Sequence, residues 1–148
     1  MFHPETETPC PACPACPACT SFMDSLNGLA PHVRSKVNLV VVAKAPIEQF
    51  RAWARSRNWN NHYLLSSFNN SYNIDYHGED KDGNQMPALN VFHKTEKGIF
   101  HFYNTELLYA QTVEGQHPRH ADLLWPVWNS FDLTPEGRNG WSPKYSYN

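Results

Sequence analysis

The sequence predicts a single domain of the α/β class, and three stretches of the chain support that fold. Residues 22–33 repeat apolar side chains at helical spacing, residues 37–43 form a short β-branched run, and residues 88–104 contain two apolar runs around a tight turn. Helical periodicity beside nearly continuous apolar strands is typical of a sheet that helices cover. With 148 residues, of which 41% are hydrophobic and 14% aromatic, the chain is long enough for one packed core.

The first predicted helix spans residues 17–36. Its buried face carries four apolar residues at helical spacing, namely Phe22, Leu26, Leu29 and Val33. Pro31 lies inside this helix, and because proline has no amide hydrogen we expect a kink after Asn27 and Gly28. The run that follows, at residues 37–43, is nearly all apolar, which predicts a parallel strand covered on both faces.

Pro46 predicts the start of a second helix, because proline suits the first helical position. Ile47, Phe50 and Ala54 lie on one face of that helix. Residues 63–67 follow as a predicted strand. The polar residues 68–86, rich in Asn, Asp and Gly, are predicted to form a long loop or an irregular hairpin.

The clearest antiparallel hairpin joins residues 88–94 to residues 99–104. Its apolar residues are expected to fall on both faces, with Leu89, Val91, Phe100 and Phe102 on one and Phe92, Ile99 and Tyr103 on the other. This pattern predicts a sheet covered on both sides. Further on, residues 120–131 show helical spacing, which predicts a last helix with a kink at Pro126.

The histidines and the acidic segment of the chain have simple structural interpretations. His93 and His101 are predicted to face opposite sides of the hairpin, so we expect hydrogen-bonded structural roles for them rather than shared metal ligation. We expect the same of His77, His117 and His120. Residues 79–83 are predicted to form a solvated turn, since they lack the ligand pattern of a twelve-residue calcium loop.

The four cysteines of the chain lie in one run in which Pro-Ala separates each from the next: Cys10, Cys13, Cys16 and Cys19. This spacing excludes a disulfide framework that joins distant segments. Proline favours extended backbone before Cys16, which predicts an N-terminal arm at residues 1–15 and a folded domain at residues 16–148. In polyproline II the α-carbons of successive cysteines in this arm would be roughly 9 Å apart, too far for a disulfide.

Cys16 and Cys19 differ from the other two because the first helix can begin between them. With Cys16 as N-cap and Pro17 at the first helical position, Cys19 follows one turn later, within disulfide range. The unpaired amides and partial positive charge of a helix N-terminus stabilise a thiolate. These features predict an exposed redox pair in which Cys16 is the nucleophile and Cys19 the resolving thiol.

Two other interpretations of the sequence stay open. The four thiolates of Cys10, Cys13, Cys16 and Cys19 are enough for tetrahedral zinc or an iron–sulfur cluster. The second alternative is not an enzyme but a catalytically silent interaction module, which accepts a strand from a partner or from itself. The redox interpretation implies no organic cofactor.

Composition restricts the partners of the chain. A formal charge of -2, with 12 basic and 14 acidic residues and no basic run, argues against a nucleic-acid partner. The first residues lack the basic and apolar regions of a signal peptide, and no apolar window reaches membrane-spanning length. We therefore expect a cytoplasmic protein without a membrane partner, and in that compartment close cysteines are more often redox-active or metal-binding than structural.

A Cys-x-x-Cys at the head of a helix, followed by strand, helix, proline-led hairpin and C-terminal helix, resembles the order of a thioredoxin-like fold. Matching motifs span nearly the whole chain: residues 16–22 (CPACTSF), 40–48 (VVVAKAPIE), 65–67 (LSS), 76–79 (YHGE), 85–93 (QMPALNVFH), 118–120 (PRH) and 132–138 (DLTPEGR). On these motifs the chain resembles the domain-of-unknown-function 899 family, whose members are described as predicted dithiol-disulfide oxidoreductases.

The resemblance implies a mixed sheet with helices on both faces, a redox pair at Cys16 and Cys19, and a protein or small-molecule disulfide as substrate. It also implies that Pro87 is the cis-proline opposite the cysteines and that the Met86 backbone pairs with an extended substrate. Residues 1–9 are too short and polar to form the strand that precedes the cysteines in such folds. We therefore expect that strand to be missing, which leaves an open sheet edge and a route to a homo-oligomer.

Overall fold

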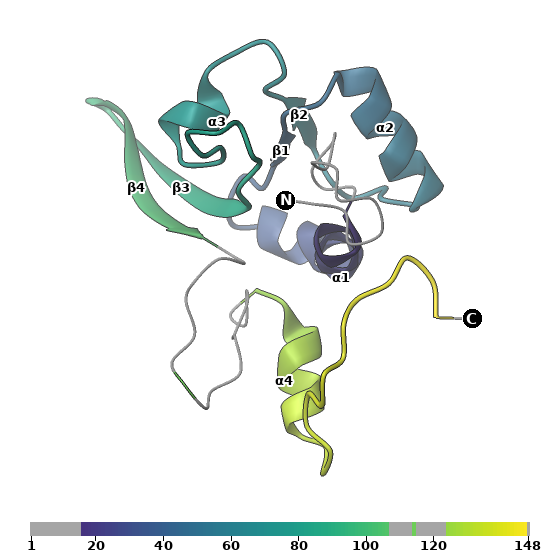
Figure 1. Cartoon of the computed structure of the whole chain (residues 1–148). Helices are drawn as coiled ribbons and strands as arrows, with labels where there is room; N and C mark the ends of the chain where they lie inside the picture. Colours follow the sequence, from purple (N-terminus) through teal and green to yellow (C-terminus); the bar gives the residue numbers. More distant parts are fainter. Residues whose placement is uncertain (1–15, 107–113, 115–123, 148) are drawn as a thin grey trace.

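The computed structural model describes residues 16–106, 114 and 124–147 of the chain. Its helices and strands are, in chain order, α1 (Pro17–Arg34), β1 (Val41–Ala43), α2 (Ile47–Ser56), β2 (Leu64–Ser66), α3 (Tyr72–Asp75), β3 (Ala88–Thr95), β4 (Gly98–Glu106) and α4 (Pro126–Asp132). The predicted α/β class is confirmed. Figure 1 shows α1, α2, β1 and β2 together, with the β3–β4 hairpin extending away from them.

Two separate two-stranded sheets take the place of the predicted single mixed sheet in the part of the chain that the structure describes. β1 is parallel, as predicted, and its partner is β2, with Val41 opposite Leu64 and Ala43 opposite Ser66. β1 is shorter than the strand expected at residues 37–43, because Val37 and Val40 are exposed rather than covered. The expectation that no strand precedes the cysteines concerns residues 1–15, which lie outside the described residues.

α1 begins where the prolines predict. Cys16 is its N-cap, Pro17 its first residue, and Pro31 lies inside its last turn. The helix ends at Arg34, two residues before the predicted end, and the amide of Ser35 donates to the carbonyls of Pro31 and His32. Basic side chains at His32 and Arg34 suit this end of the helix, where the carbonyl groups leave partial negative charge.

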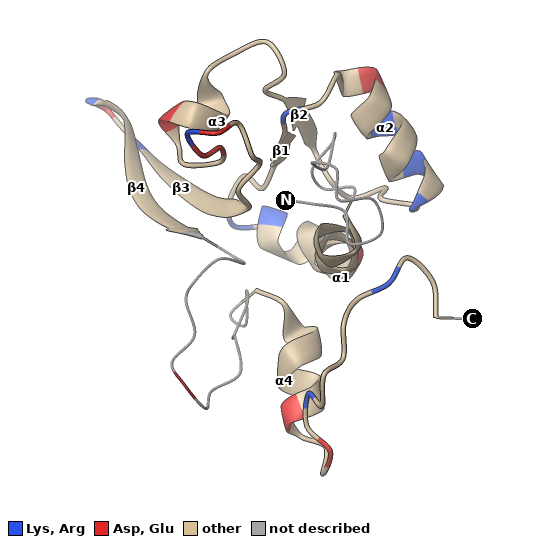
Figure 2. Ribbon diagram, in the orientation of Figure 1, with Lys and Arg blue, Asp and Glu red and all other residues tan. Residues whose placement is uncertain are grey.

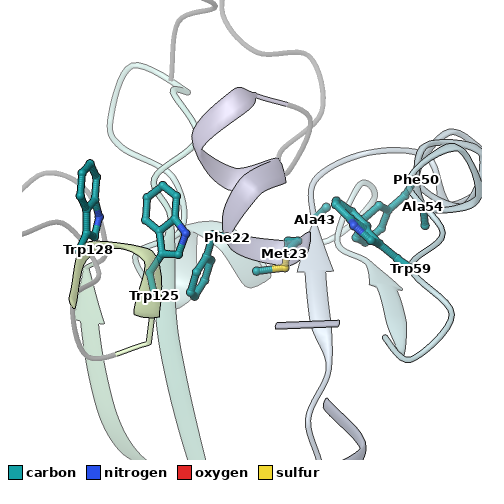
Figure 3. Close-up of a cluster of buried hydrophobic side chains, with 8 residues drawn as sticks. All are labelled: Phe22, Met23, Ala43, Phe50, Ala54, Trp59, Trp125 and Trp128. Carbon is teal, nitrogen blue, oxygen red and sulfur yellow. The ribbon is translucent and has the colours of Figure 1, made fainter. Parts of the chain in front are cut away.

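The core is an aromatic cluster built around one face of α1. Eight buried residues form it: Phe22, Met23, Ala43, Phe50, Ala54, Trp59, Trp125 and Trp128. Figure 3 shows Met23 between a group with Phe50, Ala54 and Trp59 and a group with the two later tryptophans. The rings of Phe22 and Trp125 are 6.0 Å apart, edge to face, a geometry that aromatic pairs favour. This cluster joins α1 to β1, α2 and α4.

The last helix differs from its prediction because Pro126 begins α4 instead of kinking it. Trp125 is the N-cap residue, and a proline at the first helical position loses no helical hydrogen bond. Residues 120–123 of the predicted helix lie outside the described residues. Trp128 in this helix is buried against Trp125, with ring centroids 5.3 Å apart.

The β3–β4 hairpin is antiparallel, as predicted, and contains an irregularity between Val91 and Phe92. Tyr103 pairs with Val91, and Phe92 pairs with His101, so Phe102 is an extra residue without a cross-strand partner position. Because paired residues share a face, Tyr103 lies on the Val91 face and not on the predicted Phe92 face. A β-bulge of this kind has no clear signal in the alternation of the sequence.

Neither face of the hairpin is fully covered, since Phe92 and Ile99 on one face are 39% and 70% exposed, but that face has the ring contacts with Tyr76. On that face Phe92 and His101 stack with ring centroids 5.0 Å apart, and Tyr76, the residue after α3, contacts both rings. The other face leaves Phe102 74% and Phe100 51% exposed, so the prediction of a hairpin covered on both sides is wrong. Figure 2 shows both basic and acidic residues at the tip of the hairpin.

Candidate functional site

The Cys16–Cys19 pair has the helix-start geometry that the sequence predicts. Cys16 is extended, with φ -74° and ψ 156°, and its carbonyl accepts the amide of Thr20 at 2.8 Å. The backbone N–H of Cys19 donates to the sulfur of Cys16 at 3.2 Å. Both residues are present as thiols. The sulfur of Cys16 therefore caps α1 in the way that a serine or aspartate oxygen usually does.

The same contacts change the acidity of Cys16. A hydrogen bond from the Cys19 side chain, with backbone amide hydrogen bonds from Cys19 and Ala18, lowers the pKa of the Cys16 thiol to about 7. Burial acts in the opposite direction and raises it, but the hydrogen bonds prevail. A pKa lowered in this way favours the thiolate at neutral pH, the form that acts as a nucleophile.

Both sulfurs are buried, which corrects the expectation of an exposed pair. Cys16 is 2% exposed, Cys19 is 5% exposed, and the next residue, Thr20, has no exposed surface. The helix start satisfies the electrostatic requirement of a reactive cysteine, and the packing around it restricts access. Cys10 and Cys13 lie outside the described residues.

Met86 and Pro87 follow an irregular hairpin, which one of the two interpretations of residues 68–86 predicts, whereas the short helix α3 in the same segment was not predicted. Glu79 and Gln85 form an isolated antiparallel bridge, and the amide of Met86 donates to the carbonyl of Gly78 at 2.9 Å. The Met86 amide is therefore used within the chain, and a substrate strand would have to pair with the Met86 carbonyl. The roles of Met86 and Pro87 toward a substrate stay predictions.

A polar network that sequence reasoning missed fixes this segment to the parallel strands. Lys44 directly follows β1 and forms an ion pair with Glu79, whose side chain is only 10% exposed. The Asn73 amide donates to Gln85 at 2.7 Å, and Ser67, just after β2, donates to Asn73. The sequence does contain an indication of this network. Polar residues directly follow both predicted strands, and the ends of two parallel strands lie side by side.

A second missed cluster joins α1 to the residues after α2. Asp24 accepts hydrogen bonds from the Arg57 guanidinium and, at 2.7 Å, from the indole nitrogen of Trp59. Arg57 also donates to the carbonyl of Tyr145 at 3.0 Å. Asp24, Arg57 and Trp59 help to line a surface depression of about 360 Å³. Because these polar groups are already paired with one another, the cluster is best explained as a stabilising contact.

His101 has the predicted hydrogen-bonded role, and His93 and His101 lie on opposite faces of the hairpin, as predicted. His101 lies within 2.9 Å of the Asn90 side-chain oxygen, His62 lies within 2.9 Å of the Met23 carbonyl, and His93 contacts Phe102 on the opposite face of the hairpin from His101. Within residues 16–106, 114 and 124–147 no three side chains of His, Cys, Asp or Glu are placed to hold a metal ion. His117 and His120 lie outside the described residues.

The acidic segment at residues 79–83 forms a turn, as predicted. The Asp80 carboxylate accepts the amides of Asp82 and Asn84, and Gly83 has a φ of +83°, a conformation that glycine adopts without strain. The Asn84 side chain, with the backbone amides of Asn84 and Asp82, lowers the pKa of Asp80. No helix among the described residues has both the length and the apolar character needed to cross a membrane.

Comparison with known proteins gives one match. The model of the DUF899 family, described as a bacterial protein of unknown function, matches residues 1–147. No curated protein and no solved structure matches the chain.

Proposed function

The chain belongs to the DUF899 family of bacterial proteins, and for it we propose thiol–disulfide exchange at Cys16 and Cys19. The Cys16 thiolate attacks one sulfur of a substrate disulfide, a mixed disulfide forms, and the other substrate sulfur leaves as a thiolate. The Cys19 thiolate then attacks the sulfur of Cys16, which closes the Cys16–Cys19 disulfide and releases the second substrate thiol. Two electrons pass from the protein to the substrate.

The observation that carries this proposal is the contact between the two cysteines. The amide of Cys19 donates to the Cys16 sulfur at 3.2 Å, and the Cys19 side chain makes the largest contribution to lowering the pKa of Cys16. A nucleophilic thiolate and a second thiol one helical turn away are the two groups that the reaction needs. We further propose that the domain is an incomplete thioredoxin-like fold in which Met86 and Pro87 contact the substrate.

Disulfide mapping tests the proposal. In a Cys10→Ser/Cys13→Ser protein, a small disulfide such as 2-hydroxyethyl disulfide should produce one Cys16–Cys19 disulfide that reopens with dithiothreitol. Cys19→Ser should accumulate the mixed disulfide at Cys16, because the resolving thiol is gone. Unchanged disulfide reduction by Cys16→Ser would contradict the proposal. Four protected thiols with stoichiometric zinc or iron in the unsubstituted chain would favour the metal interpretation instead.

A second candidate function, the interaction module, is favoured by the exposed face of the hairpin. Val91, Phe100, Phe102 and Tyr103 are all at least 39% exposed, an apolar surface of the kind that partner proteins cover. Sedimentation velocity of the purified chain checks this function. A monomer at all concentrations that binds no partner would count against it, whereas self-association lost in Phe102→Ser would support it.

A further inference from the structure

The start of α1 is closed to large reactants. Cys16, Cys19 and Thr20 are each at most 5% exposed, and Ala18 packs against the aromatic cluster. The first turn of α1 contains no acidic residue. A reactant that reaches the Cys16 sulfur must therefore enter a helix start that leaves almost no side-chain surface exposed.

Thiol–disulfide exchange places heavy demands on space at such a sulfur. The attacking, attacked and leaving sulfurs must lie nearly in line, and the mixed disulfide then attaches half of the substrate to Cys16. For a protein disulfide that half is a second polypeptide chain. A sulfur atom in a residue that is 2% exposed cannot accept it unless the start of α1 opens.

A hydroperoxide makes much smaller demands, because its reaction adds a single oxygen atom to the sulfur. We infer that the preferred oxidant of the buried Cys16–Cys19 pair is a small, uncharged hydroperoxide, which oxidises Cys16 to a sulfenic acid that Cys19 resolves. This inference rests on the proposed redox role of the pair and specifies the class of substrate that reaches it.

The reaction balances in two steps. The Cys16 thiolate attacks one oxygen of the hydroperoxide, a sulfur–oxygen bond forms, the oxygen–oxygen bond breaks, and the leaving oxygen takes a proton and departs as water or an alcohol. The Cys19 thiol then condenses with the sulfenic acid, which forms the Cys16–Cys19 disulfide and releases water. The sulfur atoms lose two electrons and the hydroperoxide gains them. A small dithiol returns the disulfide to the reduced pair by two exchange steps.

The geometry of the pair suits this sequence. The Cys19 side chain and amide both contact the Cys16 sulfur, so the resolving thiol is next to the sulfenic acid where it forms. An uncharged oxidant of a few atoms also loses less hydration on entering a buried site than a charged disulfide such as oxidised glutathione does. Prompt resolution protects Cys16 from oxidation beyond the sulfenic acid.

A series of oxidants of increasing size tests the inference. In the Cys10→Ser/Cys13→Ser protein at pH 7, the rate of formation of the Cys16–Cys19 disulfide is measured with hydrogen peroxide, tert-butyl hydroperoxide, 2-hydroxyethyl disulfide and insulin. The same protein unfolded in urea gives the reference rate for each oxidant. For hydrogen peroxide we expect the rate in the folded protein, divided by the rate in the unfolded protein, to be about one or higher. The folded protein has a larger fraction of Cys16 thiolate, which offsets the lower nucleophilicity of a thiolate with a lowered pKa. The ratio should fall with size, to below roughly 0.01 for insulin.

Two variants identify the residues involved. Cys19→Ser should accumulate a Cys16 sulfenic acid that dimedone labels, and Cys16→Ser should form none. Equal folded-to-unfolded ratios for hydrogen peroxide and for the two disulfides would overturn the inference but leave the proposed exchange function intact. Failure of every oxidant to close the Cys16–Cys19 disulfide in the folded protein would overturn both.

Discussion

The aromatic cluster around α1 and the β3–β4 hairpin use similar side chains in opposite ways. Phe22, Trp125 and Trp128 are at most 8% exposed and contact one another through their rings. On the hairpin, Phe100 and Phe102 are at least half exposed. The stability of the protein should therefore depend on the first region far more than on the second.

The difference follows from how many elements meet in each region. The cluster receives residues from α1, β1, α2 and α4, so each ring is covered from several directions. Among the described residues the hairpin sheet has two strands, and the ring contacts of its Phe92 face come from Tyr76, just after α3. Two strands without a third, or without a helix across both faces, are marginally stable in water. An apolar residue is buried only where the tertiary structure supplies a second surface.

The largest expected effect is that of Trp125→Ala. Trp125 is 1% exposed and contacts Phe22 and Trp128, so its removal should leave a cavity and lower the free energy of unfolding by about 3–5 kcal/mol. Urea unfolding followed by circular dichroism measures this. A loss below about 1 kcal/mol would mean that α4 is not part of the core.

Asp24→Asn should have an intermediate effect. The change keeps the size of the side chain but removes the charge that Arg57 and Trp59 contact, and we expect a loss of about 1–2 kcal/mol. Because the Asp24 side chain is 34% exposed, solvent screens part of this interaction. Glu48→Gln is the matched control. It breaks an exposed ion pair with Arg51 and should cost at most about 0.5 kcal/mol, so equal losses in both variants would contradict this role of Asp24.

The pH dependence of alkylation tests the contacts of Cys16. In the Cys10→Ser/Cys13→Ser protein, the rate at which iodoacetamide modifies Cys16 should reach half of its maximum at about pH 7, since only the thiolate reacts. Cys19→Ala removes the side-chain hydrogen bond, so the pKa of Cys16 should rise toward the ordinary value and the thiolate fraction at pH 7 should fall. Cys19→Ser retains a donor and should shift the midpoint less. An unchanged midpoint in Cys19→Ala would show that the Cys19 side chain does not stabilise the thiolate.

The smallest effect is expected for Phe102→Ser. Phe102 is 74% exposed, so the free energy of unfolding should change by no more than about 0.5 kcal/mol. Solubility should increase because an exposed ring is removed. A loss of several kcal/mol, measured by urea unfolding at low protein concentration, would reveal a packed partner on this face and remove the contrast between the two regions.

The sequence by itself determined the local features of this protein. The start of α1 at Cys16 and Pro17, the existence of strands β1 and β2 and the antiparallel pairing of β3 with β4 all agree with prediction. Each depends on interactions over a few residues, such as the missing amide of proline or the alternation of a strand. Such constraints are visible in neighbouring sequence letters.

Only the tertiary structure decided which surfaces are covered. The burial of Cys16 and Cys19, the exposure of Phe102, and the contacts of Lys44 with Glu79 and of Asp24 with Arg57 join residues far apart in the chain. The bulge beside Phe92 also changed the face on which Tyr103 lies. The sequence shows which residues are apolar, and their periodicity shows on which side of its own element each one lies. Whether another element packs there depends on the whole fold, because burial requires two surfaces and a single stretch of sequence specifies only one.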